Sequence, residues 1–116
     1  MKKLSSHTKA FQKNKLKSGE EIIDHLEGYI GEMMGSGENT QHNGSLILTT
    51  DRVVFYRKGF FGERIRQIKL EKITSIDTDT LLGHKTLEFH TSHDSIKFKT
   101  FDKFDEVLEK VEELRA

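Results

Sequence analysis

The sequence of 116 residues contains no cysteine, no proline and no tryptophan. Without cysteine the chain has no disulfide framework and no thiolate chemistry, which fits a reducing cytosol without requiring one. No apolar run approaches the ~20 residues needed to span a bilayer, and the basic start lacks the apolar segment of a secretory signal. We therefore expect a cytoplasmic protein that contacts a membrane only peripherally, at its inner face.

The formal net charge is zero, but the charges are segregated along the chain. Residues 1–17 carry six lysines and no acid, and residues 18–51 carry seven acids and no lysine or arginine. Residues 52–72 carry seven basic residues against two acids. The balanced total argues against a nucleic-acid-binding domain, which is usually basic as a whole. The blocks instead predict a surface potential that varies over the molecule.

The length predicts one domain that buries its own core. We divide the chain into a basic leader, residues 1–17, and a single domain, residues 18–116. The leader has only three large apolar residues, Leu4, Phe11 and Leu16, a thin stripe for a helix. We expect a frayed arm or a short helix laid on the domain. The alternative is a basic arm that contacts anionic lipid or nucleic acid.

Residues 44–76 contain the clearest strand pattern, with short runs of β-forming residues between turns. Asn43-Gly44 is a hairpin signal, and residues 59–62 predict a second hairpin. For the first strand, the capping-box spacing of Ser18 and Glu21 leaves a helix open as the alternative. The strands that we expect cover residues 21–34, 45–49, 53–58, 64–70, 73–80, 85–91 and 95–100. The last two alternate between apolar and polar residues, which predicts that Leu87, Phe89, Ile96 and Phe98 face the core.

Two of these strands are almost continuously apolar, at residues 46–48 and 53–56. Both of their faces are therefore expected to be covered, as in a small barrel. Along the next strand the apolar spacing changes from three to two, at Ile65, Ile68 and Leu70. That change predicts a bulge near residues 66–67.

Residues 101–115 carry the single apolar stripe of an amphipathic helix, with Thr100 or Asp102 expected as the N-cap. The stripe consists of Phe101, Phe104, Val107, Leu108, Val111 and Leu114. The stripe is expected to join the core; the alternative is that part of it binds a second copy of the chain in a homo-oligomer. About seven antiparallel strands and one C-terminal helix predict a mainly β (α+β) fold. In it the helix caps the open end of a barrel.

The order of these motifs resembles a known family. The motifs are Gly19-Glu20-Glu21-Ile22, the run over residues 44–56, the glycine hairpin over residues 59–62, the spaced Ile68, Leu70, Ile73 and Ile76, and the closing helix. Together they resemble the pleckstrin-homology (PH) superfold, specifically bacterial PH-like domains of the YokE-like type, which are similar to GRAM domains. The resemblance covers residues 19–115. It implies a PH-like barrel without catalytic machinery that binds membrane, lipid or protein, although fold alone does not fix function.

The second hairpin is the candidate binding surface. Two adjacent aromatic residues stand among basic ones there, a combination that suits an anionic membrane interface or a protein partner. The alternative is that both rings fold back over the rim of the barrel. The candidate residues are Arg57, Lys58, Phe60, Phe61, Arg64 and Arg66.

The resemblance also directs attention to the loop after the first strand. Many phosphoinositide-binding PH domains carry a basic cluster on their first two strands and the loop between them. In this chain residues 18–51 contain seven acids and no lysine or arginine. These acids would repel a headgroup that carries several negative charges. We therefore predict no specific inositol phosphate site at residues 35–44.

Neither a metal site, nor a cofactor, nor catalysis is predicted. His84, His90 and His93 lie close in sequence, but a zinc site needs three or four converging ligands, and their spacing spans two strands and a turn. Asp77 and Asp79 alternate on one strand without a recognisable acid–base or nucleophile partner. Two further histidines, His25 and His42, are expected to be ordinary surface residues.

The leading functional hypothesis is a non-catalytic binding module that recognises a protein or peptide through a strand edge or a groove. The alternative is weak peripheral association with anionic membrane, through the leader and the hairpin over residues 57–66. Binding of nucleic acid by the leader is the least favoured hypothesis.

Overall fold

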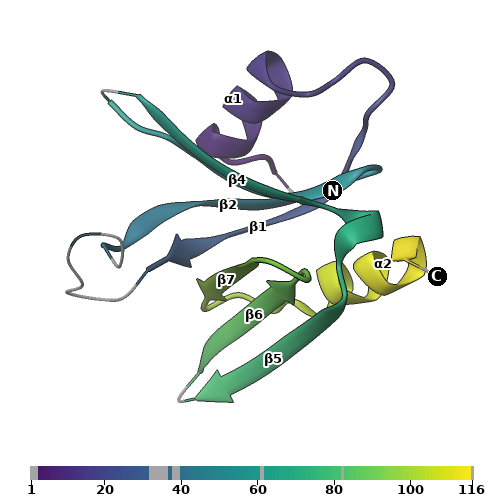
Figure 1. Cartoon of the computed structure of the whole chain (residues 1–116). Helices are drawn as coiled ribbons and strands as arrows, with labels where there is room; N and C mark the ends of the chain where they lie inside the picture. The colour runs from purple at the N-terminus through teal and green to yellow at the C-terminus, as the bar shows by residue number, and fades with distance from the viewer. Residues whose placement is uncertain (1–2, 32–36, 38–39, 61, 82, 116) are drawn as a thin grey trace.

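The computed structural model describes residues 3–31, 37, 40–60, 62–81 and 83–115. Within this part, seven strands and a 3-10 turn, η2, follow one another along the chain between two helices. Figure 1 shows how these elements are arranged in space. The elements are α1 (Ser6–Asn14), β1 (Ile22–Ile30), β2 (His42–Thr49), β3 (Arg52–Lys58), β4 (Glu63–Lys69), η2 (Leu70–Lys72), β5 (Ser75–Leu81), β6 (His84–His90), β7 (Ser95–Thr100) and α2 (Asp105–Arg115).

All seven strands belong to one antiparallel sheet in the order β4-β3-β2-β1-β7-β6-β5. The sheet folds over on itself, so that β1, β2 and β4 lie above β5, β6 and β7 in Figure 1, with α2 at the right-hand end. This arrangement confirms the predicted PH-like barrel of about seven antiparallel strands with a C-terminal helix.

The main core lies on the inner face of the folded sheet. Because side chains alternate between the two faces of a strand, every second residue of a strand points into this core. In β6 and β7 the inner residues are the predicted alternating ones, and α2 adds residues from its apolar stripe. Burial of each large side chain stabilises the fold by about 1.5–3 kcal/mol. The central members of this core are Leu46, Leu48, Val53, Phe55, Leu87, Phe89, Ile96, Phe98, Val107 and Val111.

A second, smaller cluster lies on the outer face of β2 and β3, where α1 covers it. Ser5 caps α1 by accepting a hydrogen bond from the Thr8 N–H (3.1 Å). Phe11 is fully buried and packs edge-on against Tyr56, with ring centroids 5.6 Å apart; Ile47 and Val54 complete the cluster. Residues 6–14 of the leader are thus a packed helix, which explains why two strands are apolar on both faces.

Gly44 does not lie in a hairpin turn, contrary to the expectation from Asn43-Gly44. It lies within β2, directly opposite Gly28 of β1. A Cβ atom at Gly44 would come within 2.6 Å of the Tyr56 carbonyl oxygen, and one at Gly28 within 2.1 Å of the Lys99 carbonyl oxygen. Both glycines therefore permit close approach of backbones where the sheet curves. β1 itself ends at Ile30, and residues 32–34 lie outside the described residues.

The predicted bulge near residues 66–67 is wrong. The pairing of β3 with β4 runs without a shift from Arg52 opposite Lys69 to Lys58 opposite Glu63. The spacing of three arises because Ile65 and Ile68 lie on different faces of the sheet. Ile65 lies opposite Tyr56 on the outer face, and Ile68 lies opposite Val53 on the inner face. The register shift that the structure does contain lies in β1, between residues 22 and 24.

The C-terminal helix begins four residues later than predicted, at Asp105. The N–H of Leu108 donates to the carbonyl oxygen of Phe104 (2.9 Å), which makes Phe104, rather than Thr100 or Asp102, the cap position. Phe101 is 67% exposed and stacks on His84 instead of joining the core. No helix in the described part of the chain is both long and apolar enough to cross a membrane.

Candidate functional site

The tip of the β3–β4 hairpin is closed by a hydrogen bond from the Gly59 N–H to the Gly62 carbonyl oxygen (2.7 Å). The Phe60 side chain is 94% exposed, so this ring does not fold back over the rim of the barrel. Phe61, its predicted companion, lies outside the described residues. Exposed apolar surface rimmed by polar residues is a feature of contact surfaces, whereas a single exposed ring is common on proteins.

Arg57 and Arg64 face each other across the hairpin, directly opposite in register. Directly opposed like charges destabilise a strand pair. Arg57 donates to the Asn43 carbonyl oxygen (2.7 Å), and neither guanidinium has an ion-pair partner among the described residues. Burial lowers the pKa of nearby His42, and the charges of Arg64 and Arg57 lower it further. The base of the hairpin tip is therefore strongly electropositive.

Arg66 and Lys58 are placed differently from these two arginines. The Arg66 Nη2 donates to Asp94 Oδ2 (2.9 Å) and to the Ser95 carbonyl oxygen (2.9 Å), and so ties β4 to the β6–β7 turn. The Ser95 N–H and Arg66 both lower the pKa of the Asp94 carboxyl. Lys58 lies opposite Glu63, and its N–H donates to His7 Nδ1 of α1 (3.0 Å). Arg66 is thus held at the β6–β7 turn, whereas Lys58, which is exposed, directly precedes the tip.

Glu20 and Arg52 form a buried ion pair, although both belong to the charge blocks from which a surface potential was predicted. Arg52 Nε donates to Glu20 Oε2 (2.8 Å) and Nη2 to Oε1 (3.0 Å), and both side chains are at least 95% buried. Burial alone would raise the pKa of Glu20, but hydrogen bonds from Arg52, the Lys17 N–H and Thr49, with the charge of Arg52, lower it to about 2. Arg52 also lies over the Phe11 ring, 5.1 Å from its centroid, and donates to the Lys15 carbonyl oxygen. The pair fastens the leader to the barrel.

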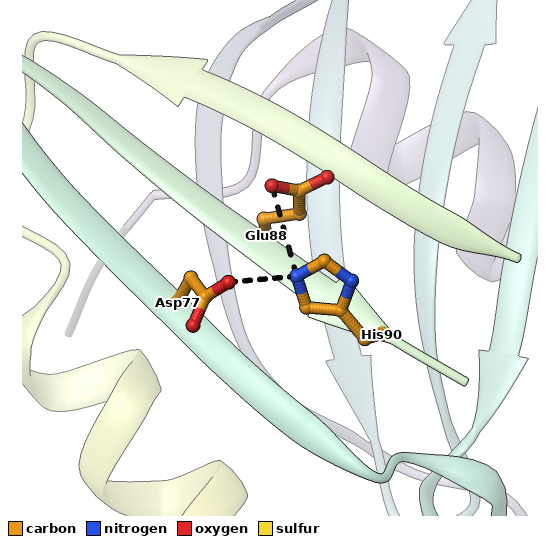
Figure 2. Close-up of side chains that lie close together, drawn as sticks. All are labelled: Asp77, Glu88 and His90. Atoms are coloured by element: carbon orange, nitrogen blue, oxygen red, sulfur yellow. Dashed lines mark hydrogen bonds and ion pairs between the residues drawn. The ribbon is translucent and has the colours of Figure 1, made fainter. Parts of the chain in front are cut away.

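Three side chains that could ligate a metal meet on the outer face of β5 and β6. Figure 2 shows His90 Nε2 pointing toward Asp77 Oδ2 (2.9 Å) and Glu88 Oε1 (3.7 Å). The hydrogen bond between His90 and Asp77 accounts for their approach, Asp77 is 72% exposed, and Lys97 lies directly opposite Glu88. The cluster is a polar network in which Asp77 is exposed and Glu88 and His90 are half-buried, and the expectation of no metal site stays a prediction.

The histidines considered from sequence have separate environments. His84 stacks on Tyr29 and shares a hydrogen bond with its hydroxyl (2.5 Å), while His93 lies in the exposed turn after β6. His25, expected on the surface, is instead buried in β1. The local pattern did not indicate burial of His25, because alternation along a strand would give the buried face to its neighbour Leu26. In β1 side chains on both faces are covered.

A cleft of about 590 Å³ lies at the other end of β3 and β4. A hydrogen bond from the Leu70 N–H to the Asp51 carbonyl oxygen (3.0 Å) and one from Arg115 Nη2 to the Ile73 carbonyl oxygen (3.3 Å) hold its walls together. Leu114, predicted to join the core with the rest of the apolar stripe, is 40% exposed in this cleft. The lining residues are Thr50, Asp51, Leu70, Glu71, Ile73, Glu112, Leu114 and Arg115.

Comparison with known proteins places this fold among PH domains. A family model described as "Bacterial PH domain" matches residues 16–114, whereas no protein with a curated description matches the chain. The C-terminal domain of an unknown Leishmania infantum protein is 17% identical, with a TM-score of 0.65 and 92% of each chain covered. The Vps36 N-terminal PH domain is 17% identical, with a TM-score of 0.62 over 86% of this chain and 82% of that one. A duf1696 family protein with a pleckstrin-homology domain from Shewanella loihica is 11% identical, with a TM-score of 0.62 over 97% and 100%.

Proposed function

The chain belongs to the bacterial PH domain family, and on this basis we propose that it is a non-catalytic binding module that docks on anionic membrane surfaces. The exposure of Phe60 between the opposed Arg57 and Arg64 is the observation that carries the proposal. An aromatic ring at a hairpin tip inserts at the level of the lipid headgroups, while nearby cations are attracted to anionic lipids by about 1 kcal/mol each.

The leader adds basic charge beside the hairpin, because α1 packs on β3. Lys9 and Lys13 are exposed on α1. The one acid of the hairpin, Glu63, is bound by Lys15 Nζ (2.6 Å) and by the Tyr56 hydroxyl, and its pKa is lowered, chiefly by the hydrogen bond from Lys15. This pairing neutralises the one acid on the face of the hairpin that α1 covers, whereas Arg57 and Arg64 lie on the opposite face, because side chains alternate along a strand.

The Phe60→Ser variant is expected to bind phosphatidylserine-containing vesicles about 10-fold or more weakly than the wild type, because burial of a phenylalanine contributes about 1.5–3 kcal/mol. Co-sedimentation over a range of lipid concentrations measures the affinity. Phe101→Ser removes another exposed ring and is the matched control, expected to bind as the wild type does. Wild-type binding should also vanish above ~0.3 M salt. Equal binding by the two variants would refute insertion of Phe60.

Recognition of a protein segment is the second candidate function, and the exposed Leu114 in the cleft favours it. A photo-crosslinking amino acid in place of Glu71, in the native host, is expected to capture a protein. The same amino acid in place of Glu109, an exposed residue of α2 outside the cleft, serves as the control. Capture at position 71 should disappear in the Leu114→Ser variant. Capture that is equal at both positions, or unaffected by Leu114→Ser, would contradict recognition through the cleft.

A further inference from the structure

We infer that the cleft between the β2–β3 turn, η2 and the last turn of α2 binds a basic segment of a partner protein that carries an apolar anchor residue. This inference rests on protein recognition, the second of the two proposed functions. It adds the chemistry of the partner, which the charges and the floor of the cleft define.

The floor of the cleft is apolar. Leu70 and Ile73 are buried at its base and belong to the main core, while Leu114 remains 40% exposed beside them. An apolar side chain placed there would shield Leu114 from water, which is favourable because apolar surface is removed from water. The cleft therefore suits one apolar anchor residue of an incoming segment.

The rim of the cleft is acidic. Arg115 is its only basic residue among the described lining residues, and Arg115 Nη1 is already paired with Glu112 (3.1 Å). Glu71 has no ion-pair partner in the described part of the chain, and Asp51 has only the half-exposed Lys17 at 3.9 Å. Two carboxylates thus remain for cations of a partner, and charge complementarity of this kind steers association and excludes acidic partners.

Two lysines near Glu71, Lys69 and Lys72, are not among the residues that line the cleft. Lys72 and Lys69 line a separate pocket with His93, beside the β6–β7 turn. The acidic rim also lies at the opposite end of β3 and β4 from Phe60, so a strand of seven residues, or roughly 20 Å, separates the two surfaces. A partner in the cleft would leave the hairpin accessible to a membrane.

Short labelled peptides test the inference with the full chain at ~0.15 M salt. In one peptide leucine alternates with lysine, in the second leucine alternates with glutamate, and in the third serine alternates with lysine. Fluorescence anisotropy gives the affinities, and NMR amide shifts locate the binding. We expect only the leucine–lysine peptide to bind, with shifts at Glu71 and Leu114 and none at Phe60.

Two variants and a matched control complete the experiment. Asp51→Lys combined with Glu71→Lys is expected to weaken binding at least about tenfold, Leu114→Ser is expected to remove the shifts, and Glu109→Lys is expected to change neither. Thermal unfolding checks that every variant is folded.

Each other outcome overturns the inference. A basic segment with an apolar anchor is the wrong ligand if either of the other two peptides binds the cleft as well as the leucine–lysine peptide does. The same holds if Glu109→Lys weakens binding as much as Asp51→Lys combined with Glu71→Lys. Neither outcome contradicts a protein captured by crosslinking at position 71. Failure of the leucine–lysine peptide to bind has the same meaning. If Leu114→Ser instead alters the oligomeric state, a second copy of the chain occupies the cleft.

Discussion

The Arg52→Ala variant is expected to lose about 3–5 kcal/mol of its free energy of unfolding, because removal of one partner of a buried ion pair leaves the other charge buried and uncompensated. Arg52 binds both oxygens of Glu20, the Lys15 carbonyl oxygen and Gln67. Loss of the Arg52 side chain therefore leaves the Glu20 carboxylate buried without its cation, and it also releases the end of the leader at Lys15. Urea unfolding at pH 7 measures the change.

A double-mutant cycle separates the stranded charge from the other contacts of Arg52. Glu20→Gln on the Arg52→Ala background removes the unpaired carboxylate, so the double variant should be more stable than Arg52→Ala alone. Removal of the Arg66 side chain, which forms an exposed ion pair with Asp94, is a suitable comparison: Arg66→Ala is expected to cost about 1 kcal/mol or less. If Arg52→Ala costs no more than Arg66→Ala, the buried pair does not stabilise the fold.

The same pair predicts how the stability of the wild type depends on pH. The pKa of Glu20 is lowered in the folded state from 4.5 to about 2, so its contribution is present above pH 4.5 and is lost as the pH falls toward 2. The shift corresponds to about 3 kcal/mol. In Arg52→Ala the carboxylate of Glu20 keeps its burial, which raises its pKa, but loses the hydrogen bonds and the charge of Arg52. Acidification from pH 7 to pH 5 should then protonate Glu20 and restore part of the lost stability. The Glu20→Gln variant should show neither effect.

The sequence was most informative where a contact depends on neighbouring residues. Alternation in residues 85–91 and 95–100 correctly placed Leu87, Phe89 and Phe98 in the core, and the glycines of residues 59–62 correctly indicated the hairpin between β3 and β4. The predicted fold followed from these local patterns and from the family resemblance, because a series of antiparallel hairpins leaves few ways to cover apolar strands.

Long-range contacts were the source of the errors. Gly44 has the local sequence of a turn, but backbone crowding from β3 requires a glycine inside β2. Glu20 and Arg52 are 32 residues apart, so no local pattern joins them. Phe101 and Leu114 fit the helical spacing of the core residues, yet one lies in the turn before α2 and the other at an open cleft.

The candidate surfaces could be predicted only in part, for the same reason. The sequence indicated Phe60 and its basic neighbours, but a ring folded over the rim and a ring in solvent have the same local sequence. The separation of Arg66 from Arg57 and Arg64 depends on Asp94, a residue of a distant turn. The cleft was missed altogether, since its walls come from three segments that are not adjacent in sequence.

Phe11 makes the leader part of the folded unit, and Phe11→Ala is expected to cost about 3–5 kcal/mol of stability. The ring is fully buried among Ile47, Val54 and Tyr56, so its removal leaves a cavity and uncovers the outer face of β2 and β3. Phe101→Ala removes the same atoms from a ring that is 67% exposed and should cost about 0.5 kcal/mol or less. Chemical unfolding of both variants measures the difference.

The titration of Tyr56 shows whether the whole helix α1 detaches or only the cavity forms. Burial raises the pKa of Tyr56 to about 12, and the hydrogen bond to Glu63 and its charge contribute. If Phe11→Ala releases α1, Tyr56 loses its cover and Glu63 loses its ion pair with Lys15. The pKa of Tyr56 should then fall toward 10, which ultraviolet absorbance at alkaline pH measures. A destabilised variant whose Tyr56 still titrates near 12 would mean that α1 stays in place. A variant as stable as Phe101→Ala would mean that the leader is a dispensable arm, with the domain boundary at residue 18.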